Sequence, residues 1–572
     1  MRARDGWHAL RGFGLLAALA LLGASCSATS NQSPNNGGSG GAGGGTGGGA
    51  DDAGISVGGS AGGDDAGVVD PETCAEAAER KTYIGCDFWP TVTANGVWSV
   101  FDFAVVAANA GSETASVTVT IGGTPVGSAD IPPNELRTIY LPWVPALKGP
   151  EADQCNQATT SPTTARVNGG AYHLVSTRPV AVYQFNPLQY ASIGGAPGKN
   201  WSQCKPTAPT CPFPTNCNQT YYTYSNDASL LLPSTAMTGN YRMAGRHGYH
   251  HFVTSYPEFM AITGTENGTS VTVYVSGTGT IEAGGGIAAV PAGGSTTFSL
   301  DAGDVVQLFT YTSLTGAGEL SGSLVQASKP VQVITGTACS LVPDDKVACD
   351  HTEESLLPAE TFGKRYFVSP PTGPKGDVPG HVVRIYGNFD GTSFTYPSGA
   401  PSGAPTTLNA GQWVDLGVVK QSFEVEGSEP FAVASFQLAG SLVDPDPQAP
   451  DEVNIDGKGD PSLSLMTAVE QYRVKYVFLA PLNYDVSYAD VVMPLDATLT
   501  LDGAPVIATP QTIGSGYGVA RLPLGAGKDG AHVLVASKPV GLQVLGYGRY
   551  TSYQYPGGMN LKAIAPPPPI PR

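Results

Sequence analysis

Apolar and polar residues alternate, or run as short β-branched stretches, along most of the chain between about residues 74 and 564. Clear examples are Val117-Thr-Val-Thr-Ile, Val271-Thr-Val-Tyr-Val and Val382-Val-Arg-Ile-Tyr, and segments rich in Gly, Pro, Asn and Asp separate such runs. Alternation and β-branched residues are typical of strands. Helical periodicity is almost absent, and one short turn each is expected within 356–362 and 465–474. The pattern predicts an all-β protein.

A phrase built around proline recurs four times in this region. Its copies are Thr177-Arg-Pro-Val, Ser328-Lys-Pro-Val, Ser428-Glu-Pro-Phe and Ser537-Lys-Pro-Val, and each leads into an apolar strand. The period of about 100 residues predicts about four internal repeats, built as tandem β-sandwich-like units. Their approximate limits are 73–225, 226–350, 351–460 and 461–564. A β-propeller is the alternative, although units of this length are about twice as long as a usual blade.

The two ends of the chain have a different composition. Basic residues precede an apolar run from Gly12 to Ser25, which is the layout of an export signal. Small residues directly before Cys26 resemble a bacterial lipoprotein signal, in which this cysteine becomes the lipidated first residue. The linker that follows is too rich in Gly, Ser and Asp to bury a core, so we expect it to be disordered. The chain thus divides into signal peptide, linker, β region and Pro-rich tail at 1–26, 27–72, 73–564 and 565–572.

The charge of the chain and its expected lipid anchor indicate where the protein resides and what it contacts. The formal net charge is -18 and only 13% of the residues are charged, so no basic surface for nucleic acid is expected. Contact with a membrane is expected through the lipid anchor only. We expect the protein in the cell envelope, anchored in the outer membrane and exposed at the surface, with secretion as the alternative.

Eight cysteines remain once Cys26 is set aside as the lipid site. An even number in an oxidising compartment predicts four disulfides. The expected local bridges are Cys74–Cys86 and Cys339–Cys349. The connectivity of the other four stays open; they are Cys155, Cys204, Cys211 and Cys217.

Two acidic segments are candidates for a structural Ca²⁺, which takes six to eight oxygen ligands. The first holds Asp350, Glu353 and Glu354, and its alternative is a solvated loop closed by a disulfide. The second places Asn454, Asp456 and Asp460 near a glycine bend, and its alternative is a plain loop between units. No other cofactor is expected.

Histidines 247, 250 and 251 form a candidate zinc site. Neighbouring histidines point to opposite sides of a strand, and no H-E-x-x-H motif supplies the other ligands. A surface hairpin is therefore favoured. No nucleophile elbow occurs outside the linker, and no pair of carboxylates stands out, so we expect no enzyme and assign no catalytic residue.

Several blocks resemble the family named for the N-terminal domain of the IgGFc-binding protein. They include Tyr83-Ile-Gly-Cys-Asp-Phe-Trp-Pro, Phe101-Asp-Phe-Ala-Val-Val, Asn226-Asp-Ala-Ser-Leu-Leu-Leu-Pro and Cys349-Asp-His-Thr-Glu-Glu. The resemblance is collinear over about 80–560. It implies adhesion or immunoglobulin binding, and it supplies no catalytic residues. Many bacterial members resemble lipoproteins with Gly-rich linkers.

Together these features predict a surface-anchored, non-enzymatic binding or adhesion protein whose ligand is a protein or a glycan. Exposed aromatic side chains in loops are expected to contact the ligand. The richest clusters are Tyr221 with Tyr222, and Tyr547, Tyr550, Tyr553 and Tyr555. The alternatives are a passive envelope or matrix spacer and a hydrolase of surface polysaccharide.

Overall fold

The computed structural model describes residues 70–151, 161–201, 222–251, 254–313, 316–346, 348–447, 449–453 and 457–571. The signal peptide, Cys26 and nearly all of the linker lie outside these residues. So do Tyr221, Asn454 and Asp456, and the four cysteines Cys155, Cys204, Cys211 and Cys217.

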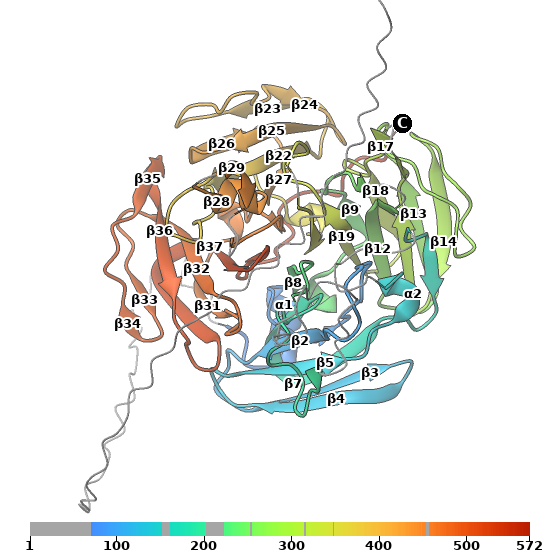
Figure 1. Ribbon diagram of the computed structural model, residues 1–572, viewed down its shortest axis with the longest axis horizontal. Coiled ribbons are helices and arrows are strands. Elements are labelled where there is room, and N and C mark those ends of the chain that lie inside the picture. The colour runs from blue at the N-terminus through green and yellow to red at the C-terminus, as the bar shows by residue number, and fades with distance from the viewer. Residues whose placement is uncertain are drawn as a thin grey trace, which may run out of the picture. The chain divides into compact units, whose positions relative to one another are not determined.

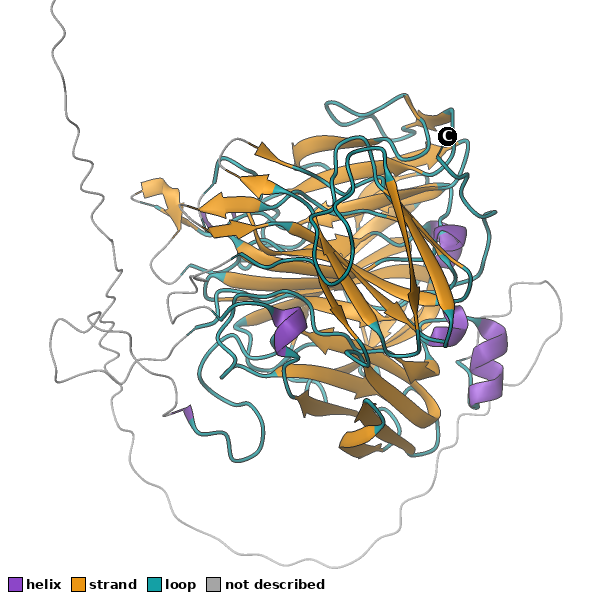
Figure 2. Cartoon of the chain, turned by 90° about the vertical axis from the view of Figure 1, so that its right-hand side faces the viewer, coloured by secondary structure: helices purple, strands orange, loops and turns teal. Residues whose placement is uncertain are grey.

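The described residues are mostly β-strands, as Figure 2 shows in orange. Two single turns of 3-10 helix, Ala359–Thr361 and Val469–Gln471, lie where short turns are expected. Helix α1 (Cys74–Arg80) is not expected from the pattern, and Thr73 caps it by accepting the N–H of Glu76 at 3.2 Å. The other α-helices of the described chain are single turns, α2 (Pro145–Lys148) and α3 (Gly440–Val443).

The strands fall into four groups, and the colours of Figure 1 trace them from blue to red. The groups follow one another along the chain, except that β6 precedes β7 in sequence but pairs with β15 of the second group. The first group contains β1 (Gly85–Phe88), β2 (Phe103–Ala108), β3 (Ala115–Ile121), β4 (Thr124–Ile131), β5 (Leu136–Leu141), β7 (Tyr172–Phe185) and β8 (Ala228–Leu231). The second contains β6 (Ala165–Val167), β9 (Asn240–Arg242), β12 (Glu258–Gly264), β13 (Thr269–Tyr274), β14 (Ser295–Leu300), β15 (Val305–Phe309), β18 (Leu324–Ala327), β19 (Val331–Ser340) and β20 (Asp350–Ser355).

The third group contains β21 (Arg365–Val368), β22 (His381–Gly387), β23 (Thr392–Thr395), β24 (Thr407–Leu408), β25 (Trp413–Val419), β26 (Phe423–Gly427), β27 (Phe431–Phe436) and β30 (Leu463–Leu465). The fourth contains β31 (Arg473–Leu479), β32 (Val486–Pro494), β33 (Leu499–Leu501), β34 (Ala504–Pro505), β35 (Gln511–Gly514), β36 (Tyr517–Leu524), β37 (Ala531–Gly548) and β38 (Thr551–Pro556). Three small hairpins project from the groups: β10 (Tyr249–His251) with β11 (Thr254–Tyr256), β16 (Thr312–Ser313) with β17 (Gly316–Ala317), and β28 (Pro445–Asp446) with β29 (Ala449–Val453).

Each group is layered like a sandwich. The second and third groups consist of two sheets each, in the orders β20-β19-β12-β15-β6 with β14-β13-β18-β9, and β21-β26-β23-β24 with β25-β22-β27-β30. In the first group the long strand β7 pairs with β3 through its first half and with β2 through its second half. Strand β37 does the same with β33 and β32 in the fourth group. The all-β fold with tandem sandwich-like units is confirmed.

The last strand of each group carries the contacts between groups. We call β8, β20, β30 and β38 the inner strands. Each pairs antiparallel with the strand that follows or contains the repeated proline, namely β7, β19, β27 or β37. The inner strands also contact one another in a closed order, β8 with β20, β20 with β30, β30 with β38, and β38 with β8. The described groups therefore meet through one shared centre.

The two ends of the folded region also meet. The N–H of Tyr83 donates to the carbonyl of Met559 at 3.1 Å, and the N–H of Leu561 donates to the carbonyl of Lys81 at 2.8 Å. Arg473, which is buried, donates to Asp70. These contacts tie the segment before the first group to the segment after the fourth.

Candidate functional site

Asp227 joins the four inner strands through a single carboxylate. One oxygen accepts the backbone N–H groups of Ala228 at 2.9 Å and Gln554 at 3.4 Å. The other accepts those of Glu353 at 3.1 Å and Leu463 at 3.0 Å. These donors lie on β8, β38, β20 and β30, so every inner strand contributes one bond.

This carboxylate is completely buried. Burial raises the pKa of Asp227 well above its usual value, whereas the backbone donors favour the charged form and oppose that shift. Its two oxygens nevertheless satisfy one buried backbone N–H group on each inner strand. Asp227 therefore acts as a structural clamp on the fold rather than as a group accessible to a ligand.

The first candidate calcium segment forms β20 in the same centre. All residues of this strand are buried, so the alternative prediction of a solvated loop is wrong. The segment is buried because its side chains point into a polar core. Glu353 accepts from Gln184 Nε2 at 3.0 Å and from Thr93 Oγ1 at 2.7 Å. Asp350 accepts from Thr551 Oγ1 at 2.7 Å, and Glu354 accepts from the N–H of its neighbour Ser355.

Hydrogen-bond donors thus surround these carboxylates, which is the environment of an anion rather than of a Ca²⁺ cage. Asp460 is also buried, and burial together with the charge of Asp350 raises its pKa. Among the described residues no cluster of His, Cys, Asp and Glu is arranged to hold a metal ion. Calcium at the second acidic segment stays a prediction, because Asn454 and Asp456 lie outside the described residues.

The disulfides Cys74–Cys86 and Cys339–Cys349 are present, as expected. The second one closes the loop that leads from β19 into β20. This loop carries Asp344 to the rim of a pocket in the second group.

The candidate zinc histidines lie beside that pocket, on and next to the hairpin β10–β11. His250 Nδ1 contacts Ser255 Oγ at 2.7 Å, whereas His247 Nε2 contacts Asp344 Oδ2 at 3.1 Å. The two rings therefore engage different partners. The side chain of His251 lies outside the described part of the structure.

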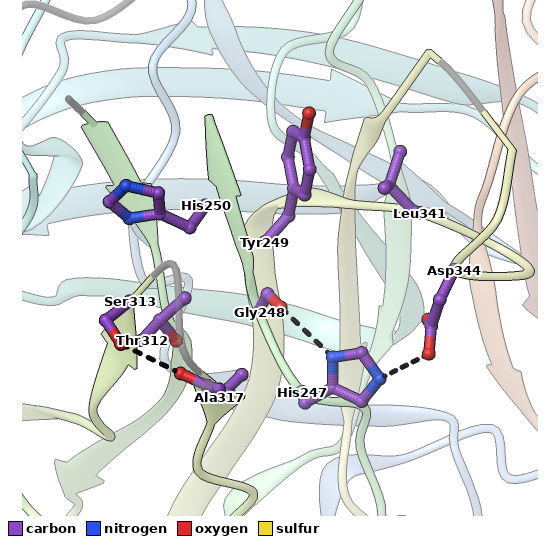
Figure 3. Close-up of a pocket in the computed structure, with 10 residues that line it drawn as sticks. His247, Gly248, Tyr249, His250, Thr312, Ser313, Ala317, Leu341 and Asp344 are labelled. Carbon is purple, nitrogen blue, oxygen red and sulfur yellow. Dashed lines mark hydrogen bonds and ion pairs between the residues drawn. The ribbon is translucent and has the colours of Figure 1, made fainter. Parts of the chain in front are cut away.

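Figure 3 shows this pocket, a cavity of about 260 Å³ lined by His247, Tyr249, Thr312, Leu341 and Asp344 among others. The His247 ring has an acceptor at each nitrogen, because its Nδ1 also lies 3.0 Å from the carbonyl of Gly248. Only the doubly protonated ring donates to both. Burial works against its charge, but the hydrogen bond and charge of Asp344 outweigh burial and raise the pKa of His247.

A chain of ion pairs runs from this pocket into the third group. Arg246 donates to both Asp344 and Asp415, the latter at 3.0 Å. Asp415 also accepts from Arg384 at 2.9 Å, and Arg384 pairs with the buried Glu319. The charges on the two sides of this boundary are therefore matched, and the pocket rim is held by both strand groups.

The aromatic residues that were expected to be exposed differ in burial. Tyr547, Tyr553 and Tyr555 are completely or almost completely buried, so the expectation that they are exposed is wrong. These tyrosines lie on β37 and β38, and their rings point into the centre of the fold. There Tyr555 packs on Tyr183 with ring centroids 4.9 Å apart. Tyr222 and Tyr550 are half-buried instead.

Tyr222 and Tyr550 belong to one cluster, although they are far apart in sequence. Tyr224 lies between them, with ring centroids 5.8 Å from each. The guanidinium of Arg549 covers the rings of Tyr222 at 5.1 Å and Tyr550 at 5.8 Å. We call Tyr222, Tyr224, Arg549 and Tyr550 the tyrosine–arginine cluster.

Two further tyrosines, Tyr190 and Tyr484, extend this set of ring contacts. Tyr190 stacks on Tyr222 with ring centroids 6.0 Å apart and makes a tilted contact with Tyr484 at 5.1 Å. The hydroxyl of Tyr190 donates to Asp485 at 2.7 Å. The loops that carry Tyr190 and Tyr484 also present Ile193 and Leu482, which are 53% and 57% exposed. The cluster therefore joins loops of the first and fourth groups.

Sequence reasoning missed Asp227, Tyr190, Tyr484 and Arg549 as members of these sites. A sequence pattern could have pointed to Asp227, because an acidic or polar residue precedes the leucines at the start of each later unit. No local pattern marks the other three, whose partners come from distant loops.

Comparison with known proteins places the chain in a family. The family model described as IgGFc binding protein matches residues 227–546, which is more than half of the chain. The chain therefore belongs to the IgGFc-binding protein family. The human IgGFc-binding protein is 27% identical over 365 residues, which cover 60% of this chain and 6% of that protein. The chain thus spans a small fraction of this relative's length.

Two solved structures of anti-sigma factor domain-containing proteins, one from Clostridium clariflavum, also match weakly. They are 12% and 13% identical, with TM-scores of 0.10 and 0.11. They cover 59% and 55% of this chain and 91% and 83% of their own, and likenesses this low carry no argument. The helices within the described residues are too short or too polar to cross a bilayer.

Proposed function

We propose that this chain is a non-enzymatic binding protein that recognises a protein ligand through the tyrosine–arginine cluster. Tyrosine and arginine are enriched at the energetic centres of protein interfaces. Here Tyr190 packs on Tyr222, and Tyr484 packs on Tyr190, so little side-chain freedom would be lost on binding. That rigid, half-buried arrangement is the observation that carries the proposal.

Family membership supports a binding role. The name of the human relative refers to binding of the Fc part of immunoglobulin G. We extend only the class of ligand, a protein, to this chain. Fold and family do not by themselves carry a ligand from one protein to another.

The test is binding of the full chain to an array that carries immunoglobulin Fc and other extracellular proteins, beside a glycan array. We expect saturable binding to at least one protein. The variants Tyr222→Ala and Arg549→Ala should each weaken it by about tenfold or more. The matched control is Tyr274→Ala, which removes a half-buried tyrosine from β13. Binding to glycans only, blank arrays or turnover of an arrayed glycan would each reject the proposal.

We further propose that Cys26 anchors the protein to the outer membrane and that the linker at 27–72 displays the β region at the cell surface. The observation behind this is the apolar run that ends in small residues before Cys26. A labelled fatty acid should be incorporated into the wild-type chain but not into Cys26→Ser, which should appear in the medium. Equal labelling of both would contradict the anchor.

A further inference from the structure

Arg242, at the end of β9, is a buried cation at the boundary between the second and third strand groups. Its side chain is 1% exposed, and none of the described carboxylates forms an ion pair with it. We propose that the guanidinium of Arg242 binds a small monovalent anion, such as chloride, which helps to join the two groups. We call this place the junction site, and its residues are Arg242, Gly322, Asn388 and Gly411.

The other arginines that are buried in the described part of the chain all have carboxylate partners. Arg246 pairs with Asp344 and Asp415, Arg384 with Glu319 and Asp415, and Arg473 with Asp70. Burial of a charge is costly unless an opposite charge lies beside it. Arg242 therefore differs from these arginines in lacking the group that normally makes such burial tolerable.

One edge of the Arg242 guanidinium has no protein acceptor. Its Nη1 donates to the carbonyl of Gly322 at 2.9 Å, whereas Nε and Nη2 are buried without a hydrogen-bond partner among the described residues. Because the guanidinium is planar, the N–H of Nε and one N–H of Nη2 point in the same direction and form a fork of two donors. A fork of this kind binds an anion with both donors at once.

The charge of Arg242 favours an anion over a water molecule. Burial lowers the pKa of Arg242 to about 10, and the charge of Asp390 opposes this shift, so the side chain is a cation at neutral pH. A water molecule would accept from the fork without neutralising the charge. An anion does both, and it removes the penalty of the buried, unpaired cation.

The third strand group closes the junction site from the other side. A Cβ atom on Gly411 would lie 3.4 Å from Nη1 of Arg242 and 3.0 Å from the carbonyl oxygen of Gly322. The N–H of Gly411 donates to the carbonyl of Gly387 at 3.0 Å. The next residue, Asn388, is completely buried, and its Oδ1 and Nδ2 also lack partners. Asn388 thus brings a second unpartnered side chain, with a neutral N–H₂ donor, to the same boundary.

The surroundings limit the size and the charge of the anion. Asp390 and Asn409 are exposed and Gly411 is half-buried, so the turns that cover the site lie at the surface. Arg242 itself is almost inaccessible, and an ion must therefore be small enough to enter when these turns open locally. The nearby charge of Asp390 disfavours an anion with two charges. A small monovalent anion meets both conditions.

The experiment follows thermal unfolding of the full chain in sodium gluconate, with chloride replacing gluconate at constant ionic strength. We expect the melting temperature to rise by about 2 °C or more and to reach a plateau, because an anion that binds only the folded state stabilises it. Bromide should replace chloride, whereas sulfate should not.

Variants of Arg242 then locate the site. Arg242→Met removes the buried charge and should abolish the dependence on chloride. Arg242→Lys keeps the charge but loses the fork, and it should raise the chloride concentration at half of the effect at least tenfold. The control is Arg137→Met, which removes an arginine that is 40% exposed and should respond to chloride as the wild type does.

Bromide also gives a direct observation that needs no variant. Crystals of the wild-type chain grown with bromide should show anomalous density beside Nε and Nη2 of Arg242. Bromide density only at other places would overturn the inference, and so would a wild-type melting temperature that does not respond to chloride. An equal response of the wild type and Arg242→Met would also reject it, because the effect would then be one of salt in general.

Discussion

The carboxylate of Asp227 accepts the backbone N–H of Leu463 at 3.0 Å, across 236 residues of sequence. Asp227 lies at the start of the first inner strand and Leu463 on the third. Because Glu353 and Gln554 donate to the same carboxylate, one side chain satisfies backbone groups that no neighbouring strand reaches. The junction of the four strand groups therefore depends on a single buried acid.

Removal of this acid should be costly. Asp227→Ala leaves four buried N–H groups without an acceptor, and each costs about 1–3 kcal/mol. We expect a loss of at least about 4 kcal/mol in the free energy of unfolding. Asp227→Asn should also destabilise, because its amide N–H₂ would face two of these donors. Urea denaturation measures both.

The control for this experiment is Asp390→Asn. Asp390 is exposed and accepts the N–H of Ala410 at 3.1 Å, so it tests the same chemistry on the surface. A change in Asp227→Ala no larger than that in the control would show that the inner strands hold together without the clamp.

The His247–Asp344 pair should make stability depend on pH. The folded-state pKa of His247 is raised, so its contribution is present below the unfolded pKa of about 6.5 and is lost as the pH rises through the folded value. The pKa of Asp344 is lowered to about 2, so its contribution is present above about pH 4 and is lost as the pH falls through about 2.

The pair is therefore strongest between about pH 4 and 6.5. The difference in unfolding free energy between wild type and His247→Gln should be largest in this window and should shrink toward pH 9. NMR titration of His247 gives its pKa directly. A value at or below about 6.5 would contradict the ion pair.

The Cys339–Cys349 disulfide should stabilise the loop that carries Asp344. It closes a loop with a sequence separation of 10, for which the entropy of the unfolded chain predicts about 2–3 kcal/mol. The double variant Cys339→Ser with Cys349→Ser should lower the melting temperature. The pKa of His247 should fall in parallel, because this loop holds its partner Asp344 in place. Removal of Cys74–Cys86 is the control, since it should change stability without changing that pKa.

Calcium should have little effect on the centre of the fold. Asp350, Glu353 and Glu354 already accept from N–H and O–H donors, so addition of Ca²⁺ or of a chelator should leave the melting temperature unchanged. A chelator that lowers it would instead place an ion at the second acidic segment, and the variant Asp456→Asn would test that site.

Local patterns were enough to predict the strands and the nearby bridges. The run at 382–386 is the middle of β22, and the run at 271–275 overlaps β13. Side chains alternate with a period of two in any strand, and Gly, Pro, Asn and Asp mark the turns between strands, so both signals lie within a few residues. The two local disulfides follow for the same reason, because their cysteines are close in sequence.

The burial of individual side chains could not be predicted from local sequence. Asp350-His-Thr-Glu-Glu has the composition of a solvated loop, yet it is a buried strand because donors from β7, β8 and β38 face it. Tyr553 and Tyr555 are aromatic residues of a loop-like sequence, yet β38 carries them into the centre.

By itself, the sequence determined the all-β class, the recurring proline-led strand, the local disulfides and the family resemblance, because each rests on spacing within one short segment. Only the tertiary structure decided that four inner strands close on Asp227, that Tyr222 and Tyr550 form one cluster, and that Asp344 pairs with the buried Arg246. These features depend on which distant backbone donors and rings come within 3–6 Å of one another, and that proximity arises from packing rather than from local order.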